Sequence, residues 1–183
     1  MDVMEAPDTG EAGPNVLITG TPGTGKTSTC QAIAERTGLR HINVGDVVRA
    51  EQCHDGYNKE FDTYMLNESK LVEALEDRIQ EGGNVFDFHS CEFFPDSWFD
   101  MVVVLRAETS VLYDRLVARG YAENKVSENV ECEIMQVVLE EARDTFQMDI
   151  LHEVESNNVE DLEANVEKVA RWLEVWRGGT STS

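Results

Sequence analysis

NVLITGTPGTGKTS, residues 15–28, is the stretch of the chain that decides its fold class. Residues 15–19 form a short apolar run, long enough for a buried strand, and residues 26–36 follow with helical spacing. Between them, residues 20–27 match the pattern G-x-x-x-x-G-K-[ST] at every required position. Glycines at this spacing let consecutive N–H groups point at one anion, and the start of the helix adds its own free N–H groups. The stretch therefore predicts a phosphate-binding loop between a strand and a helix.

Three polar residues at the end of this loop, Lys26, Thr27 and Ser28, have expected partners on Mg·ATP. Lys26 can reach the β- and γ-phosphates, and the Thr27 hydroxyl can coordinate Mg²⁺. Ser28, next along the helix, is placed to contact the α-phosphate. The alternative is a glycine-rich turn that binds no ligand, and the position between a strand and a helix argues against it. The predicted ATP-binding residues are Gly23, Thr24, Gly25, Lys26, Thr27 and Ser28.

Strand and helix patterns alternate along the rest of the chain. Short apolar runs predict further strands over residues 41–44, 84–88, 101–105 and, as an edge strand, 150–154. Helical spacing predicts helices over residues 26–36, 46–52, 68–80, 109–119, 126–147 and 159–175. Residues 53–66 show no clean period and are expected to form a loop or a mobile helical segment. The alternation predicts an α/β fold, a parallel sheet with helices on both faces, whose ligands bind at the carboxyl ends of the strands.

A second acidic group is expected beside the loop, because phosphate-loop proteins use a carboxylate at the end of a neighbouring strand to hold Mg²⁺. Asp87 ends the strand 84–87 and fits this role together with Thr27. His89 follows two residues later, on the same side of an extended chain, and could orient a water molecule or a phosphate. The alternatives are a surface acid and a structural histidine.

An anionic acceptor would need arginines, which are few in this chain. Arg119 precedes Gly120 at the end of a predicted helix, so it is the best candidate for a clamp that arrives when a lid closes. Each arginine has the alternative of a surface salt bridge. No general base is required, because phosphoryl transfer depends mostly on positioning and charge neutralisation. The candidates are Arg49, Arg106, Arg119 and Arg143.

Composition bounds the remaining questions. The 183 residues fit one domain, and the formal net charge of −21 makes direct nucleic-acid binding unfavourable. That charge suits a basic protein partner, or serves solubility alone.

Four scattered cysteines without a C-x-x-C pair indicate reduced thiols in an intracellular compartment. No apolar run is long enough to cross a membrane. The acidic residues 1–14 are expected to be a disordered extension, and residues 178–183 a flexible tail.

Seven segments of the chain together resemble one family, adenylate kinase isoenzyme 6, also called the coilin-interacting nuclear ATPase. The resemblance runs from about residue 15 to residue 176. Its most specific part is DFHSCEFFP at residues 87–95, where ordinary adenylate kinases carry an arginine-containing segment. The other segments are residues 20–27, 42–46 (INVGD), 56–57 (GY), 104–106 (VLR), 112–116 (LYDRL) and 119–121 (RGY).

The resemblance implies a nucleoside monophosphate kinase fold over residues 15–177, with a five-stranded parallel sheet. It implies a monophosphate-binding region over residues 43–66 and a short lid over residues 118–128. Carried over by position, Arg119 binds ATP from the lid, and Asp87 and His89 form a magnesium and water-orienting pair. The acceptor-binding residues are then Gly45, Asp46 and Arg49.

The resemblance also implies what the protein does. It implies transfer from ATP to AMP, with dAMP and CMP as further acceptors, and a slow ATPase activity. It implies a role in maturing the small ribosomal subunit through a basic ribosomal protein, and residence in the nucleus and cytoplasm. Two alternatives to the kinase stay open: an ATP-switched assembly factor and a small-metabolite kinase. One departure from the family is Asn124-Lys125, where the lid of the family often has two lysines, so the ATP clamp is expected to be weaker.

Overall fold

The computed structural model describes residues 12–60 and 62–180, and its centre is a five-stranded parallel sheet. All pairings between neighbouring strands are parallel, which confirms the predicted α/β architecture. The strand at 150–154 is an edge strand, as expected, shifted by one residue. The strands lie in the spatial order β2 (Arg40–Asn43), β5 (Asn84–Asp87), β1 (Asn15–Gly20), β6 (Met101–Arg106) and β7 (Leu151–Glu155).

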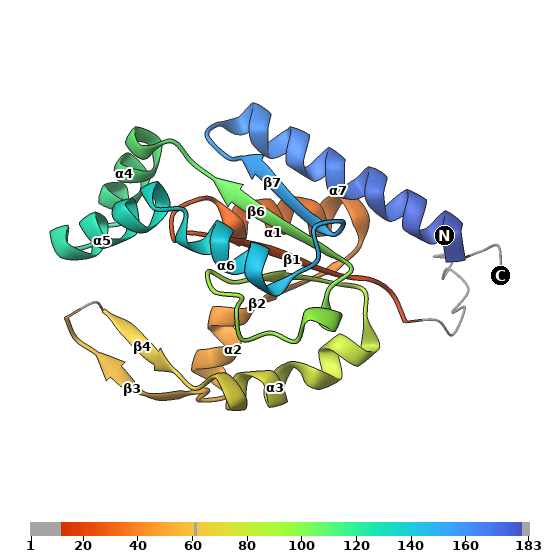
Figure 1. Ribbon diagram of the computed structural model, residues 1–183, viewed down its shortest axis with the longest axis horizontal. Coiled ribbons are helices and arrows are strands. Elements are labelled where there is room, and N and C mark those ends of the chain that lie inside the picture. Colours follow the sequence, from red (N-terminus) through yellow and green to blue (C-terminus); the bar gives the residue numbers. More distant parts are fainter. Residues whose placement is uncertain (1–11, 61, 181–183) are drawn as a thin grey trace, which may run out of the picture.

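Alternating side chains of the strands build two cores, one on each face of the sheet. Val16 and Ile18 pack with α1 (Lys26–Thr37) and α7 (Val159–Thr180) on one face. Leu17 and Phe86 face the other side, where they join the core formed by three further helices. These are α2 (Val44–Ala50), α3 (Glu68–Glu81) and α6 (Val137–Thr145). Both faces of the sheet are thus covered, and its two open edges and strand ends remain for a site (Figure 1).

Two extensions project from the carboxyl ends of the strands (Figure 1). One is the helix pair α4 (Thr109–Ala118) and α5 (Glu123–Ile134), held together by a small apolar cluster around Leu112, Leu116 and Val126. The other is an antiparallel hairpin, β3 (His54–Asn58) and β4 (Thr63–Leu66). They border the space above the phosphate loop from opposite sides.

The hairpin corrects the expectation of a loop or helical segment over residues 53–66. Its strands are half-exposed to exposed, so no alternation of apolar and polar residues marks them in the sequence. Cross-strand aromatic contacts stabilise the pairing instead. Tyr64 packs against His54, with ring centroids 4.4 Å apart, and against Tyr57 at 5.3 Å.

The helix predicted over residues 126–147 is also wrong in detail, because two helices occupy this region. α5 begins earlier, at Glu123, and the chain turns at Gln136, which has a positive φ of 57°. The turn lets α5 cover α4 while α6 buries Val138, Leu139 and Ala142 against the sheet. One straight helix could not reach both surfaces.

The described residues near the two ends of the chain differ from the predicted disordered extension and flexible tail. Residues 1–11 of the predicted extension and residues 181–183 lie outside the described residues. The Pro14 carbonyl accepts hydrogen bonds from the N–H groups of Gly83 and Asn84, so residue 14 is anchored beside the sheet. α7 continues to Thr180, so the predicted tail begins within a helix. The four cysteines are free thiols, and within the described residues no helix is long and apolar enough to cross a membrane.

Candidate active site

The phosphate loop has the backbone that its glycines allow. Gly23 and Gly25 have φ values of 95° and 92°, a left-handed conformation that glycine adopts without strain. A Cβ atom at Gly23 would lie 2.8 Å from Leu112 Cδ1, so the loop is also packed closely against α4. The Lys26 ammonium group donates to the carbonyls of Gly20 (3.0 Å) and Thr21 (3.1 Å), which holds it inside the curve of the loop.

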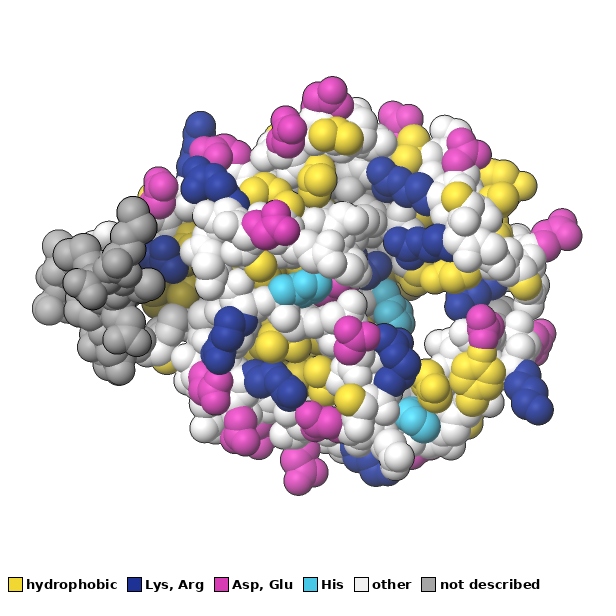
Figure 2. Space-filling model, turned by 180° about the vertical axis from the view of Figure 1, so that it is seen from behind, with side chains coloured by type: hydrophobic (Ala, Val, Ile, Leu, Met, Phe, Trp, Pro, Cys, Tyr) yellow, Lys and Arg dark blue, Asp and Glu magenta, His cyan; other side chains and the backbone are white. Residues whose placement is uncertain are grey.

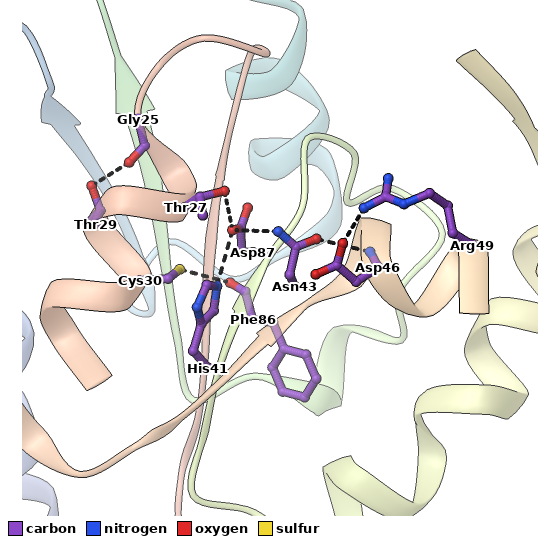
Figure 3. Close-up of polar contacts among 10 residues, drawn as sticks. All are labelled: Gly25, Thr27, Thr29, Cys30, His41, Asn43, Asp46, Arg49, Phe86 and Asp87. Carbon is purple, nitrogen blue, oxygen red and sulfur yellow. Dashed lines mark hydrogen bonds and ion pairs between the residues drawn. The ribbon is translucent and has the colours of Figure 1, made fainter. Parts of the chain in front are cut away.

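Asp87 is the hub of a polar cluster at the end of β5 (Figure 3). Its Oδ2 accepts a hydrogen bond from the Thr27 hydroxyl at 2.8 Å and a longer one from the Asn43 amide at 3.5 Å. The His41 Nε2 lies 3.2 Å from the same oxygen. Three elements, α1, β2 and β5, therefore meet at one buried carboxylate.

The donor set at this point fits Mg²⁺. A hydroxyl and a carboxylate are oxygen ligands of the kind that Mg²⁺ prefers, and they lie beside a loop shaped for phosphate. Thr27 and Asp87 would hold the ion, together with phosphate oxygens of the nucleotide. This is the arrangement of a phosphate-loop kinase or hydrolase.

The charge state of Lys26 is balanced by opposing effects. Burial lowers its pKa most strongly, the carboxylate of Asp87 raises it and the charge of Arg119 lowers it, and the net result is a fall from 10.5 to about 8. The ammonium group is therefore mostly charged at pH 7, because its pKa lies only about one unit above that pH. Phosphate oxygens in the loop would stabilise the charged form.

His89 lies on the wall of the same site and is electrically neutral near pH 7. Its side chain is exposed to the solvent in the cleft, whose walls of protein atoms surround it on several sides. This partial enclosure, with the charges of Lys26 and Lys125, lowers its pKa to about 4. A neutral imidazole can accept a hydrogen bond from a water molecule, which a charged one cannot.

A cleft of about 860 Å³ connects these groups to the β3–β4 hairpin and α5. Figure 2 shows the hollow from the rear, with Lys and Arg side chains on its border. The phosphate end is lined by Thr21, Lys26, Asp87 and His89, and a second wall, from α2 and the β3–β4 hairpin, by Gly45, Arg49, Tyr57 and Tyr64. A further part of the border comes from Tyr121, just before α5, and from Lys125, Glu128 and Asn129 of α5. This volume lies within the range of small-molecule and cofactor sites, about 300–1,000 Å³.

Comparisons with known proteins agree with this geometry. A family model described as an AAA domain matches residues 16–136. An adenylate kinase isoenzyme 6 homolog of Dictyostelium discoideum is 45% identical over 163 residues, covering 89% of this chain and 93% of the relative. A protein of the same name from Caenorhabditis elegans is 45% identical, covering 91% of this chain and 92% of its own. The chain belongs to the adenylate kinase isoenzyme 6 family.

Solved structures support the kinase fold of this family member. A shikimate kinase from Acinetobacter baumannii, in complex with shikimate, aligns with a TM-score of 0.64 over 90% of this chain and 95% of that one. The sequences are only 15% identical, so the likeness concerns the fold alone. The names of the relatives, on this fold, support a phosphate-loop kinase that binds a nucleotide.

The four candidate arginines of this adenylate kinase isoenzyme 6 family member fall into two groups: two near the cleft and two in ion pairs away from it. Arg49 lines the cleft and forms an ion pair with Asp46, whose own side chain is exposed. Arg119 is exposed at the end of α4, before Gly120 with a φ of 76°; among the described residues it is not part of the cleft lining. Its effect on the Lys26 pKa nevertheless shows that the two charges are near each other.

Two of the arginines serve the fold instead. Arg106 pairs with the buried Glu133 and, at 3.4 Å, with Glu153. Arg143 pairs with Glu140 at 2.7 Å and lies 3.6 Å from Glu153. Both lie away from the cleft lining, which leaves Arg49 and Arg119 as the candidates for binding phosphate.

Several site residues of this family member were not singled out from the sequence. His41 and Asn43 lie two residues apart on β2, so both side chains face the side of the sheet on which Asp87 lies. Two polar side chains at this spacing in a predicted strand were the signal in the sequence that could have identified them. Tyr57 and Tyr64 had no such signal, because they reach the cleft only through the hairpin.

The two extensions touch across the mouth of the cleft. The Asn124 side chain donates to the Glu60 carbonyl at 2.8 Å, and the Lys125 ammonium group to the Asp62 carbonyl at 3.1 Å. Lys125 also lies 4.2 Å from the centre of the Tyr121 ring. The single lysine of Asn124-Lys125 thus contacts the hairpin in this conformation.

Proposed function

We propose that this protein transfers the γ-phosphoryl group of ATP to AMP, with dAMP and CMP as further acceptors, and hydrolyses ATP slowly. One observation carries the proposal: residues of the phosphate loop, Arg49 and two tyrosines line a single cleft, the last three on its second wall. A donor nucleotide bound through the loop would direct its γ-phosphate toward this wall. The names of the relatives support a nucleoside monophosphate as the acceptor that the wall receives.

The residues at the phosphate end hold the donor and offset its charge. Lys26 is expected to exchange its contacts with the Gly20 and Thr21 carbonyls for the β- and γ-phosphates. The N–H groups of residues 23–28 would bind the remaining phosphate oxygens. Thr27 and Asp87 would hold Mg²⁺, and the bound ion would supply positive charge that offsets the charge of the phosphates. Arg119 would add a further charge from the lid, residues 118–128, as the lid closes.

The residues on the second wall would position the acceptor. The guanidinium group of Arg49 is a planar donor that matches a phosphate, and in the described conformation Asp46 pairs with it. Binding of AMP would therefore move Arg49 from the carboxylate to the phosphate. Gly45 lines the cleft beside it, and Tyr57 and Tyr64 offer aromatic surface to a base.

Hydrolysis needs a water molecule in place of the acceptor phosphate. His89 lines the cleft near the phosphate end and is neutral at pH 7, so it can accept a hydrogen bond from that water. AMP brings its own nucleophilic oxygen and does not require this contact.

The deciding experiment measures ADP formation from Mg·ATP by the full chain, with and without AMP. A large rise that depends on AMP, with two ADP formed per AMP consumed, is the expected result. The variant Arg49→Ala should weaken the AMP dependence while leaving the rate without AMP unchanged. A slow rate that is indifferent to AMP would refute the kinase proposal.

A second candidate is an ATP-switched factor in assembly of the small ribosomal subunit, acting on a basic ribosomal protein. The net charge of −21 favours it, because such a surface attracts a basic partner and repels nucleic acid. The same assay distinguishes the two functions: ATP turnover would then respond to the basic protein and not to AMP.

A further inference from the structure

We propose that Cys30, His41 and Asp87 form a binding site for a thiolate-preferring divalent metal ion such as Zn²⁺, and that the ion inhibits phosphoryl transfer by taking Asp87. The binding itself is independent of the proposed function. Only the inhibition rests on it.

Three separate elements bring the ligand atoms together. Cys30 lies on the second turn of α1, His41 on β2 and Asp87 at the end of β5 (Figure 3). Their Sγ, imidazole nitrogen and carboxylate oxygen all lie within 4.8 Å of one another. His41 Nε2 and Asp87 Oδ2 are already 3.2 Å apart. The fold therefore holds a mixed sulfur, nitrogen and oxygen set in a small volume.

The distances suit a tetrahedral ion after a small adjustment. With Zn–S near 2.3 Å and Zn–N or Zn–O near 2.0–2.1 Å, tetrahedral ligand atoms lie about 3.3–3.8 Å apart. The set needs to contract by about 1 Å at most. The thiol makes only a weak hydrogen bond, to the Phe86 carbonyl at 3.8 Å, so little is lost when it turns toward the ion.

The chemistry of the ligands selects the class of metal. Thiolate and imidazole favour Zn²⁺ and similar ions over Mg²⁺, which prefers oxygen. On binding, Cys30 releases its proton to solvent, and the resulting thiolate and the Asp87 carboxylate together neutralise the two positive charges of the ion. His41 binds as the neutral ring.

The position of the cluster beside the cleft decides how the metal ion enters and what its binding does to the active site. The His41 side chain is 18% exposed and Asp87 lines the cleft, so an ion can enter from solvent. Once bound, it occupies the carboxylate that contacts Thr27. Zn²⁺ and catalytic Mg²⁺ would then compete for Asp87.

The first test is direct binding of Zn²⁺ alone to the full chain, freed of metal with a chelator and followed by calorimetry. One equivalent is expected, with affinity at least about tenfold lower in Cys30→Ala and in His41→Gln. Cys53→Ala is the matched control, because Cys53 is also a buried thiol but packs in the core on the opposite face of the sheet. Equal affinity in the unmodified chain and in Cys30→Ala would overturn the proposal.

The second test uses Co²⁺ as a spectroscopic probe, and the outcome that would overturn the proposal is read on the unmodified chain alone. The unmodified chain should show a thiolate-to-metal charge-transfer band and the d–d bands of a tetrahedral ion. Cys53→Ala should keep the thiolate band and Cys30→Ala should lose it. A Co²⁺ spectrum of the unmodified chain without a thiolate band would overturn the proposal.

The third test measures inhibition of ADP formation by Zn²⁺ at fixed Mg·ATP. Cys30→Ala should be active and at least about tenfold less sensitive, and raising Mg²⁺ should relieve inhibition of the unmodified chain. Equal sensitivity of the two proteins would refute the inhibitory role. A chain that binds Zn²⁺ through Cys30 but transfers no phosphate to AMP would contradict the proposed function and leave the metal site standing.

Discussion

Raising the pH from 7 to 9 is expected to lower kcat/KM for ATP about tenfold, because the free protein binds ATP productively only when Lys26 is charged. Burial lowers the pKa of Lys26 from 10.5 to about 8, despite the neighbouring Asp87 carboxylate. A group with this pKa is about 90% charged at pH 7 and about 10% charged at pH 9. The shift corresponds to about 3 kcal/mol of lost preference for the charged form.

The two kinetic constants should respond differently. kcat/KM reports the free protein, whereas kcat reports the complex with ATP. Phosphate oxygens bound to Lys26 favour its charged form, so the fall in kcat should begin at a higher pH than the fall in kcat/KM. The assay is ADP formation in the presence of AMP, measured over ATP concentration at half-unit steps of pH.

Asp87→Asn tests the electrostatic part of this reasoning. The amide keeps the size of the side chain and can still accept from Thr27, but it removes the negative charge that raises the Lys26 pKa. The descending limb should therefore move to lower pH, and the plateau should fall about a hundredfold or more, since a ligand of Mg²⁺ is also weakened. Asp77→Asn is the control, because Asp77 is an exposed acid on α3.

Two results would refute the reasoning. A kcat/KM that stays flat from pH 7 to 10 in the unmodified protein would mean that Lys26 is not near its titration point. A descending limb at the same pH in Asp87→Asn would mean that Asp87 does not set the charge of Lys26.

Three further outcomes are expected from single substitutions. Lys26→Ala should abolish both transfer and hydrolysis, because it removes the charge next to the transferred phosphate; near-normal turnover would contradict the assignment of the loop. His89→Ala should slow ATP hydrolysis about tenfold or more and affect AMP-dependent transfer less, since AMP supplies its own nucleophile; equal losses in the two assays would indicate a structural role. Arg49→Ala should raise KM for AMP at least about tenfold with KM for ATP unchanged, whereas Arg40→Ala, which removes the exposed ion pair between Arg40 on the edge strand β2 and Glu81 on α3, should change neither.

Much of the fold was predictable because its signals are local. The strand, loop and helix of residues 15–36 are contiguous, and each of the buried strands shows its apolar run in the sequence. The helices α3 and α7 show regular apolar spacing. The elements that were predicted wrongly have no such signal: the hairpin over residues 54–66 is held by aromatic pairs across its strands, and the turn at Gln136 is required by two surfaces that α5 and α6 must each cover.

The candidate site divides in the same way. By itself, the sequence determined a phosphate loop with Lys26 and Thr27, an acid at the end of a strand, and a surface charge unsuited to nucleic acid. Only the tertiary structure placed His41 beside Asp87, 46 residues later in the chain, because the sheet order sets β2 next to β5 in a register that pairs Asn43 with Asp87. Strand order and register depend on which faces of distant elements can be buried together. No local pattern in a single chain records that choice.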